Sequence, residues 1–232
     1  MLNDSVLRAI ERFGVVPVIA IDAPDAAIPL ADALAEGGLP LAEITFRTEV
    51  AAQVIERIAL ERPSMLVGAG TVLTAANLAA AKSAGASFAV APGLNAAIVG
   101  RAAELKIPFV PGVCTPSEIE QAFALKCRLL KFFPAEASGG AAMLQALSAP
   151  YAHLGVRFMP TGGVNPDNLA EYLALPSVAA VGGTWIAKRE DLVAGRWQEI
   201  RRRCQAAVEI VRRVRGRGDS SSPLPEGEGD CC

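Results

Sequence analysis

The sequence predicts a single-domain α/β fold, a (β/α)8 TIM barrel, over residues 1–214. Eight short apolar, β-prone runs follow one another at intervals of 20 to 28 residues. The segments between them are rich in alanine and have the apolar spacing of helices. Strands that are apolar along their length and alternate with helices form a parallel sheet covered by helices, and eight such units fit a closed barrel. A doubly wound open sheet is the alternative.

The predicted strands are residues 15–20, 41–46, 66–71, 88–93, 108–113, 129–135, 157–162 and 179–184. Between them, helix start signals stand at Thr74, at Asn95, at Thr115 with Glu118 as a capping box, and at Asn165 before Pro166. In a parallel barrel the active site lies at the carboxyl ends of the strands. Polar residues at those ends are therefore the candidates for chemistry.

Composition and charge exclude several classes of protein. The 232 residues are 52% hydrophobic, which is enough for one aliphatic core, and the formal net charge is -2. No global positive field recruits nucleic acid or anionic lipid. Charged residues within the first 13 positions contradict a secretory signal, and no apolar run reaches the ~18 residues of a membrane span. We expect a cytoplasmic protein that binds neither nucleic acid nor membrane.

Metal-ligating residue types are scarce. The five cysteines lack the paired spacing of a zinc site or a disulfide framework, and His153 is the single histidine. We therefore expect chemistry without a metal or another cofactor. Residues 215–232 are polar and rich in Gly, Pro and Ser, a composition that predicts a disordered tail.

Lys131 is the most unusual residue of the chain, because it stands among leucines and phenylalanines in the predicted strand 129–135. Desolvation disfavours the ammonium form of an amine, and the neutral amine is the nucleophile of Schiff-base chemistry. The alternative is a lysine whose head extends from the end of a strand into solvent.

The second predicted strand carries polar residues on one face. Side chains alternate along a strand, so Glu43, Thr45 and Arg47 point to the same side, which would be the barrel interior. A carboxylate and a guanidinium there suit a catalytic site, although a buried structural ion pair is the alternative.

Glycine-rich strand ends predict a phosphate site. At earlier strand ends, glycines let backbone and ligand approach closely: Thr71 follows a Gly-Ala-Gly sequence, and Pro92 stands beside a glycine at the end of the fourth strand. The last two strands of many barrels bind phosphate through backbone N–H groups and a hydroxyl, whereas tight turns are the alternative reading of such pairs. The corresponding residues here are Thr161, Gly162, Gly163, Gly183 and Thr184.

Six segments together resemble the 2-keto-3-deoxy-6-phosphogluconate aldolase family across roughly residues 5–213. In chain order they read EITFRTE, GAGTVL, APGLN, KFFPAE, PTGG and GGTW. The resemblance implies a class I aldolase of the Entner-Doudoroff pathway, a lyase that splits a phosphorylated keto-acid into pyruvate and glyceraldehyde 3-phosphate. It also implies a cytoplasmic homotrimer, and some family members cleave 4-hydroxy-2-oxoglutarate as well.

The resemblance also implies roles for individual residues. Lys131 would form the Schiff base, and Glu43 would accept and donate protons through water. Arg47 would bind the pyruvyl carboxylate, Thr71 would add a hydroxyl contact, and Phe133 would wall the pocket unless it only fills the core. Pro92 would also contact the substrate.

Thr161, Gly162, Gly163, Gly183 and Thr184 would bind the phosphate. Serine is common in the family where this chain has Thr184. Three alternatives remain open: an aldolase for the galactonate epimer, a phosphate-binding barrel without catalysis, and an isomerase that uses Glu43 as base without an amine at position 131.

Overall fold

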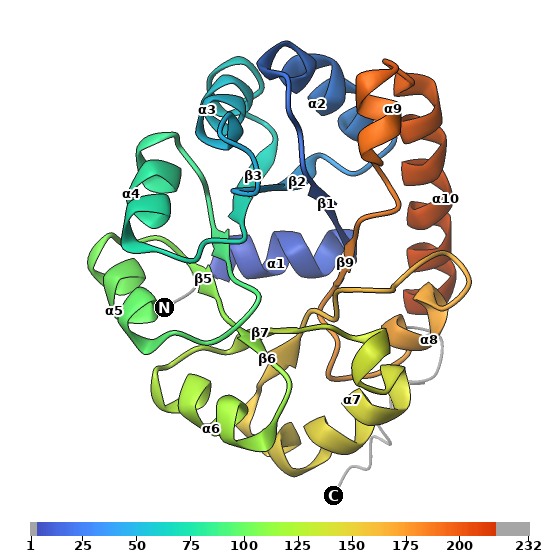
Figure 1. Ribbon diagram of the computed structural model, residues 1–232. Helices are drawn as coiled ribbons and strands as arrows, with labels where there is room; N and C mark the ends of the chain where they lie inside the picture. The colour runs from blue at the N-terminus through green and yellow to red at the C-terminus, as the bar shows by residue number, and fades with distance from the viewer. Residues whose placement is uncertain (1–3, 217–232) are drawn as a thin grey trace, which may run out of the picture.

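In the computed structural model, which describes residues 4–216, parallel strands lie at the centre and helices surround them (Figure 1). The strands are β1 (Val15–Ile19), β2 (Leu41–Thr45), β3 (Leu66–Gly70), β4 (Ala89–Val90), β5 (Phe109–Val110), β6 (Gly112–Val113), β7 (Leu129–Phe132), β8 (Arg157–Phe158) and β9 (Val181–Gly183). The α-helices are α1 (Asp4–Phe13), α2 (Ala27–Glu36), α3 (Ala51–Glu61), α4 (Ala75–Ser83), α5 (Ala96–Glu104), α6 (Pro116–Ala124), α7 (Gly140–Ser148), α8 (Leu169–Leu173), α9 (Arg189–Val193) and α10 (Trp197–Arg215). Three 3-10 helices complete the elements: η1 (Pro24–Ala26), η2 (Glu136–Ser138) and η3 (Ala149–Leu154).

Within residues 4–216 the strands form two parallel sheets, with the orders β5-β4-β3-β2-β1-β9 and β6-β7-β8. Neither sheet closes on itself. Backbone hydrogen bonds connect the two sheets on both sides. The N–H of Gly112 in β6 donates to the carbonyl of Gly93, which follows β4 (3.2 Å), and the N–H of Ala179, just before β9, donates to the carbonyl of Phe158 in β8 (2.9 Å). The prediction of a parallel α/β fold is confirmed, and each of the eight predicted runs contains a strand.

The fifth predicted run is divided between the two sheets at Pro111. Proline has no N–H to donate to a neighbouring strand, so the ladder is interrupted there. Residues before Pro111 pair with β4 through β5, whereas Gly112 is in register with Lys131 of β7. One extended segment therefore serves both sheets and leads directly to the lysine strand.

Three predicted helix starts are confirmed, since α4, α5 and α6 are capped by the side chains of Thr74, Asn95 and Thr115. The fourth is wrong. The side chain of Asn165 accepts a hydrogen bond from the N–H of Asp167 (2.9 Å) and closes a turn, so α8 begins only at Leu169.

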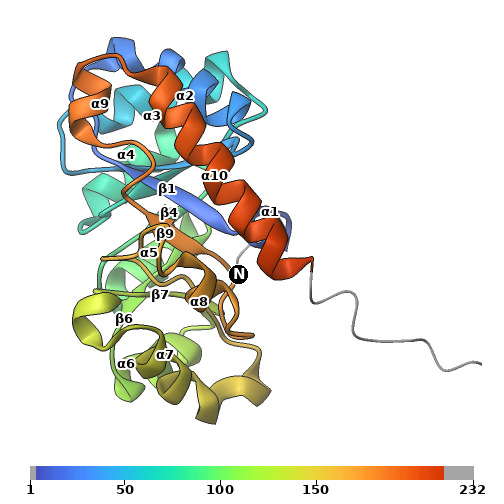
Figure 2. The same cartoon turned by 90° about the vertical axis from the view of Figure 1, so that its right-hand side faces the viewer.

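The two ends of the strands differ in what covers them. Helix α1 ends two residues before β1 and lies across the end from which β1 starts, whereas α10 runs along the side of the strands (Figure 2). Buried apolar side chains from α1 to α10 form one continuous cluster. The carboxyl ends of the strands are thus the end left for a site.

No helix among residues 4–216 combines the length and the apolar character needed to cross a membrane. Helix α10 ends at Arg215, and the rest of the predicted tail beyond Gly216 lies outside the described residues.

Candidate active site

Six polar or charged side chains are buried among residues 4–216, and four of them belong to strands or strand ends. These four are Glu43, Thr45, Lys131 and Thr161. Burying a charge is costly unless it is paired, so a group of such side chains in one place calls for a chemical explanation.

Lys131 and Glu43 form a buried ion pair between β7 and β2. Lys131 Nζ lies 3.2 Å from Glu43 Oε1, and the two residues are 5% and 0% exposed. The pair is compatible with the neighbouring strand only because residue 70 is glycine. A Cβ on Gly70 would lie 2.6 Å from Cγ of Glu43, a distance that real carbon atoms do not adopt. The sequence therefore places an amine and a carboxylate in direct contact from positions 88 residues apart.

The second oxygen of Glu43, Oε2, is buried and has no hydrogen-bond partner within the described part of the chain. A carboxylate oxygen without a partner is costly, because burial removes the water that would solvate it. At an active site such an oxygen is available to a water molecule or to a substrate hydroxyl. Glu43 can therefore hold the lysine with one oxygen and exchange a proton at the other.

Arg47 is positioned by Thr45. The Thr45 hydroxyl donates to the carbonyl of Ile19 (3.0 Å) and accepts from Nε of Arg47 (3.1 Å). Thr45 is buried, whereas Arg47 is exposed at the rim. Within residues 4–216 the other two nitrogens of the guanidinium have no hydrogen-bond partner, so they can bind a carboxylate in the two-bond geometry that arginine favours.

These side chains line a cavity of about 220 Å³. Its walls come from β1, β2, β7 and the segments that follow β2, β3, β4, β7, β8 and β9. The lining residues are Val18, Glu43, Thr45, Arg47, Thr71, Pro92, Lys131, Phe133, Thr161, Gly162 and Thr184. The structure brings together nine of the eleven residues predicted from the sequence. Gly163 and Gly183 are not among the lining residues.

Sequence reasoning missed two lining residues, Val18 and Thr45. Val18 is in parallel register with Glu43. Knowledge of the pairing between β1 and β2 would therefore have identified Val18 as a lining residue. As one apolar residue in an apolar strand, it gives no signal of its own. Strand alternation predicts that Thr45 lies on the same face as Glu43, but it does not by itself identify Thr45 as a site residue.

Two further lining residues have unusual local geometry. Thr71 has a φ of +55°, and a β-branched side chain rarely adopts this left-handed conformation. Strain of about 1–3 kcal/mol of this kind is typically found where it positions a functional group. The ring centroid of Phe133 is 5.7 Å from Lys131 Nζ, within the range of a cation–π contact. Phe133 is one of the residues that line the cavity.

The loop after β8 has the features of an anion site. The N–H groups of Gly162 and Gly163 donate to no acceptor within residues 4–216, and both glycines have positive φ, +98° and +84°. Successive unpartnered N–H groups form concave sites that bind anions. Gly183, in contrast, leaves room for a neighbour, because a Cβ there would lie 2.6 Å from the ring of Trp185.

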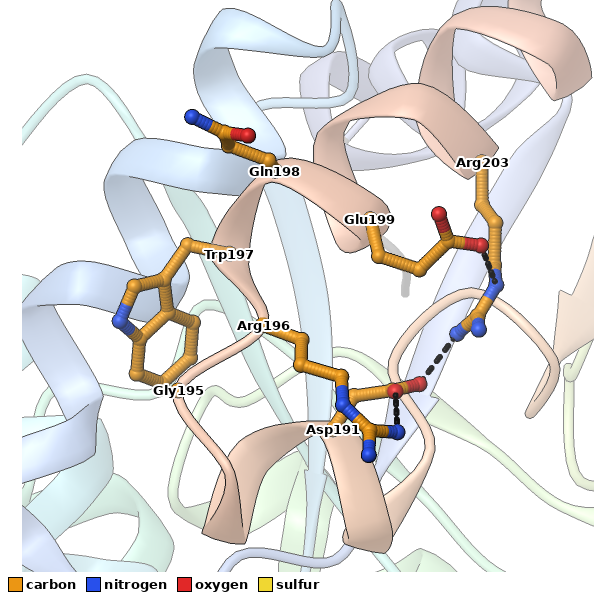
Figure 3. A pocket seen from close by; sticks show the side chains of 7 residues that line it. All are labelled: Asp191, Gly195, Arg196, Trp197, Gln198, Glu199 and Arg203. Carbon is orange, nitrogen blue, oxygen red and sulfur yellow. Dashed lines mark hydrogen bonds and ion pairs between the residues drawn. The ribbon is translucent and has the colours of Figure 1, made fainter.

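A larger cavity of about 740 Å³ lies where α9 meets α10 (Figure 3). Its buried carboxylate, Asp191, is paired through Oδ1 with Arg196 (3.2 Å) and through Oδ2 with Arg203. Burial alone would raise the pKa of Asp191, but the hydrogen bonds from these two arginines outweigh it and hold that pKa below its usual value. Glu199 completes the network on Arg203 (3.2 Å). Every charge here has a partner, which is the pattern of a structural network.

Within residues 4–216 no three His, Cys, Asp or Glu side chains are grouped so that they could hold a metal ion. The smaller cavity is lined by an amine, Lys131, and a carboxylate, Glu43.

The chain was compared with known proteins. A family model described as aldolase, KDPG and KHG aldolase, matches residues 6–203. A 2-dehydro-3-deoxy-phosphogluconate aldolase of Haemophilus influenzae is 45% identical over 210 residues, which cover 90% of this chain and 98% of that protein.

Two solved structures are similar in fold as well as in sequence. The KDPG aldolase of Legionella pneumophila, with pyruvate captured at low pH as a covalent carbinolamine intermediate, has a TM-score of 0.83 and 39% identity over 87% of this chain and 97% of that one. The 2-keto-3-deoxy-6-phosphogluconate aldolase of Zymomonas mobilis ZM4 with 3-phosphoglycerate has a TM-score of 0.79 and 37% identity over 89% of this chain and 95% of that one.

Proposed function

The chain belongs to the KDPG and KHG aldolase family, and on this premise we propose that it cleaves 2-keto-3-deoxy-6-phosphogluconate (KDPG) to pyruvate and glyceraldehyde 3-phosphate. It is a lyase of the class I type, which works through a Schiff base. The family description and the relatives also support 4-hydroxy-2-oxoglutarate (KHG) as a second substrate.

The observation that carries the proposal is the contact between Lys131 Nζ and Glu43 Oε1, with the second carboxylate oxygen unpartnered. The Lys131 amine attacks the keto carbon of the substrate and expels its oxygen as water, which gives the imine. Glu43 takes the proton of the hydroxyl next to the scissile bond, directly or through water. The electrons of that carbon–carbon bond move into the protonated imine, and an enamine remains. Protonation of the enamine and hydrolysis then release pyruvate.

The other residues bind the two ends of the substrate. Arg47 grips the pyruvyl carboxylate through its guanidinium, and Thr71 adds a hydroxyl contact, with Pro92 and Phe133 as walls. Thr161 and Thr184 contribute hydroxyl groups to the phosphate end. Among the glycines, Gly162 and Gly163 contribute N–H groups, whereas Gly183 allows close packing beside them.

We extend the proposal to the architecture. The two sheets are joined by hydrogen bonds on both sides, and β5 continues into β6 through Pro111, which supports a closed (β/α)8 barrel in which β5 and β6 act as one interrupted strand. The barrel domain comprises residues 1–214. The homotrimer and the cytoplasmic location come from the family resemblance, and light scattering of the purified protein tests the trimer.

Trapping with borohydride tests the function. We expect reduction in the presence of pyruvate to leave a stable pyruvyl adduct on Lys131, located by peptide mass spectrometry. Lys131→Arg should abolish the adduct, whereas Lys188→Arg, a change at an exposed lysine outside the cavity, should leave it intact. Folded protein without an adduct on Lys131 would refute the class I mechanism. Assay of both the gluconate and the galactonate epimers then identifies the preferred substrate.

A further inference from the structure

The loop that follows β8 is held from below by hydrogen bonds to its carbonyl groups. The carbonyl of Thr161 accepts from the N–H of Ala135 (2.8 Å), and that of Gly162 accepts from the N–H of Glu136 (3.0 Å). The carbonyl of Gly163 accepts from the side-chain amide of Asn168 (3.2 Å). With three successive carbonyls occupied, the N–H groups of the two glycines are the polar groups that remain for a ligand.

Glu136 supports this loop with its side chain as well as its backbone. A Cβ on Gly163 would lie 2.5 Å from Cβ and Cγ of Glu136, so the glycine rests directly on this side chain. The Glu136 carboxylate accepts a short hydrogen bond from the hydroxyl of Tyr172. Tyr172 comes from α8 and is fully buried. A continuous chain of contacts therefore runs from the core, through Tyr172 and Glu136, to Gly163.

The hydroxyl of Tyr172 is a permanent donor. Burial, and after it the neighbouring Glu136, raises the pKa of Tyr172, so the phenol stays protonated at physiological pH. A hydrogen bond to a carboxylate is stronger than one between neutral groups. Glu136 follows closely after Lys131 in the chain, yet it is not among the residues that line the cavity. Its position fits a supporting role and not a chemical one.

We propose that Tyr172 and Glu136 are positioning residues that hold the 161–163 loop in its phosphate-binding conformation and so set the affinity for the phosphate group of the substrate. The pair does not take part in the Schiff-base chemistry at Lys131. The inference rests on the proposed function for the identity of the substrate, but the effect on phosphate binding can be measured separately from cleavage.

The test compares Tyr172→Phe with the wild-type protein. This substitution removes one hydroxyl and keeps the ring that fills the core. We expect the Kd for 3-phosphoglycerate, measured by calorimetric titration, to rise about tenfold, in line with the loss of one charge-assisted hydrogen bond. We also expect the KM for KDPG to rise by a similar factor with little change in kcat, while borohydride trapping of pyruvate on Lys131 proceeds at the wild-type rate. Glu136→Gln, which keeps an acceptor for Tyr172, should have a smaller effect.

Tyr151→Phe is the matched control, because Tyr151 also donates to a glutamate, Glu120 (3.1 Å), but does so on the surface away from the cavity. It should leave the Kd for 3-phosphoglycerate unchanged. An unchanged Kd in Tyr172→Phe would overturn the inference, as would a parallel loss of phosphate binding and pyruvate trapping, which indicates general damage to the fold. If wild-type protein binds 3-phosphoglycerate but does not trap pyruvate, the proposed function is refuted. The positioning role is then decided by the Kd values of wild type and Tyr172→Phe alone.

Discussion

Two buried carboxylates of this molecule are each paired with a cation, yet only one of them has the features of a catalytic group. Asp191 has an arginine on each oxygen, and its network with Glu199 leaves no charge without a partner. Glu43 has one lysine on one oxygen and nothing on the other within the described residues. Both sites carry the cost of burying charge. The difference shows that a saturated pair stabilises the fold, whereas an incomplete pair is available to a substrate.

Glu43→Gln has the largest expected effect. Glutamine keeps the volume and an acceptor for Lys131, but it cannot take a proton. We expect kcat for KDPG cleavage to fall by about 10³-fold, within the range typical of a lost general base. Steady-state kinetics measure this loss, and urea unfolding checks that the variant is folded. Activity within threefold of the wild type would show that another group takes the proton.

The matching change at the other carboxylate is Asp191→Asn. It leaves Arg196 without its anion and leaves Arg203 with Glu199 alone. We expect the free energy of unfolding to fall by about 3 kcal/mol, while kcat per folded molecule stays the same. Chemical denaturation at pH 7 measures the loss. A drop in kcat at wild-type stability would mean that the second site contributes to the reaction.

The pH dependence of stability adds a check on Asp191. Its pKa is lowered in the folded protein, so the stability it contributes is present above the pKa of the unfolded chain and is lost as the pH falls through the folded value. The difference in unfolding free energy between wild type and Asp191→Asn should therefore shrink on acidification. An unchanged difference at low pH would contradict the ion-pair explanation.

The smallest effect is expected from a change at Arg47, at the rim of the cavity. Arg47→Lys keeps the charge but loses the planar fork and the bond to Thr45. We expect the KM for KDPG to rise about tenfold, equivalent to about 1.4 kcal/mol, with a smaller change in kcat. Initial-rate kinetics with KDPG measure both. A kcat loss without a change in KM would place Arg47 in the chemical step and not in binding.

Strand alternation and the position of strand ends explain why so much of the site could be predicted. Side chains of period two place Glu43 and Arg47 on one face, and parallel strands bring Lys131 to the same end. Strand alternation and the position of strand ends depend on residues close together in the chain, so they can be recognised in the sequence alone.

The remaining features depend on distant neighbours. The burial of Asp191 could not be predicted, because Arg203 belongs to α10 and reaches Asp191 only through the packing of α9 against α10. Glu136 belongs to the KFFPAE segment, but its contact with Tyr172 could not be predicted, because the two positions are 36 residues apart. Pro111 was placed inside one strand, whereas the structure shows that it divides the strand between two sheets.

Gly70 offers a route to an inactive protein whose reactive groups are all present. A single methyl group at this position would occupy the space of the Glu43 side chain and displace its carboxylate from Lys131. An engineer who wants to capture an intact sugar acid for crystallography or for biosensing therefore has an alternative to deleting the base or the nucleophile. The hydrogen atom that Gly70 carries in place of a side chain leaves the space in which Glu43 reaches Lys131.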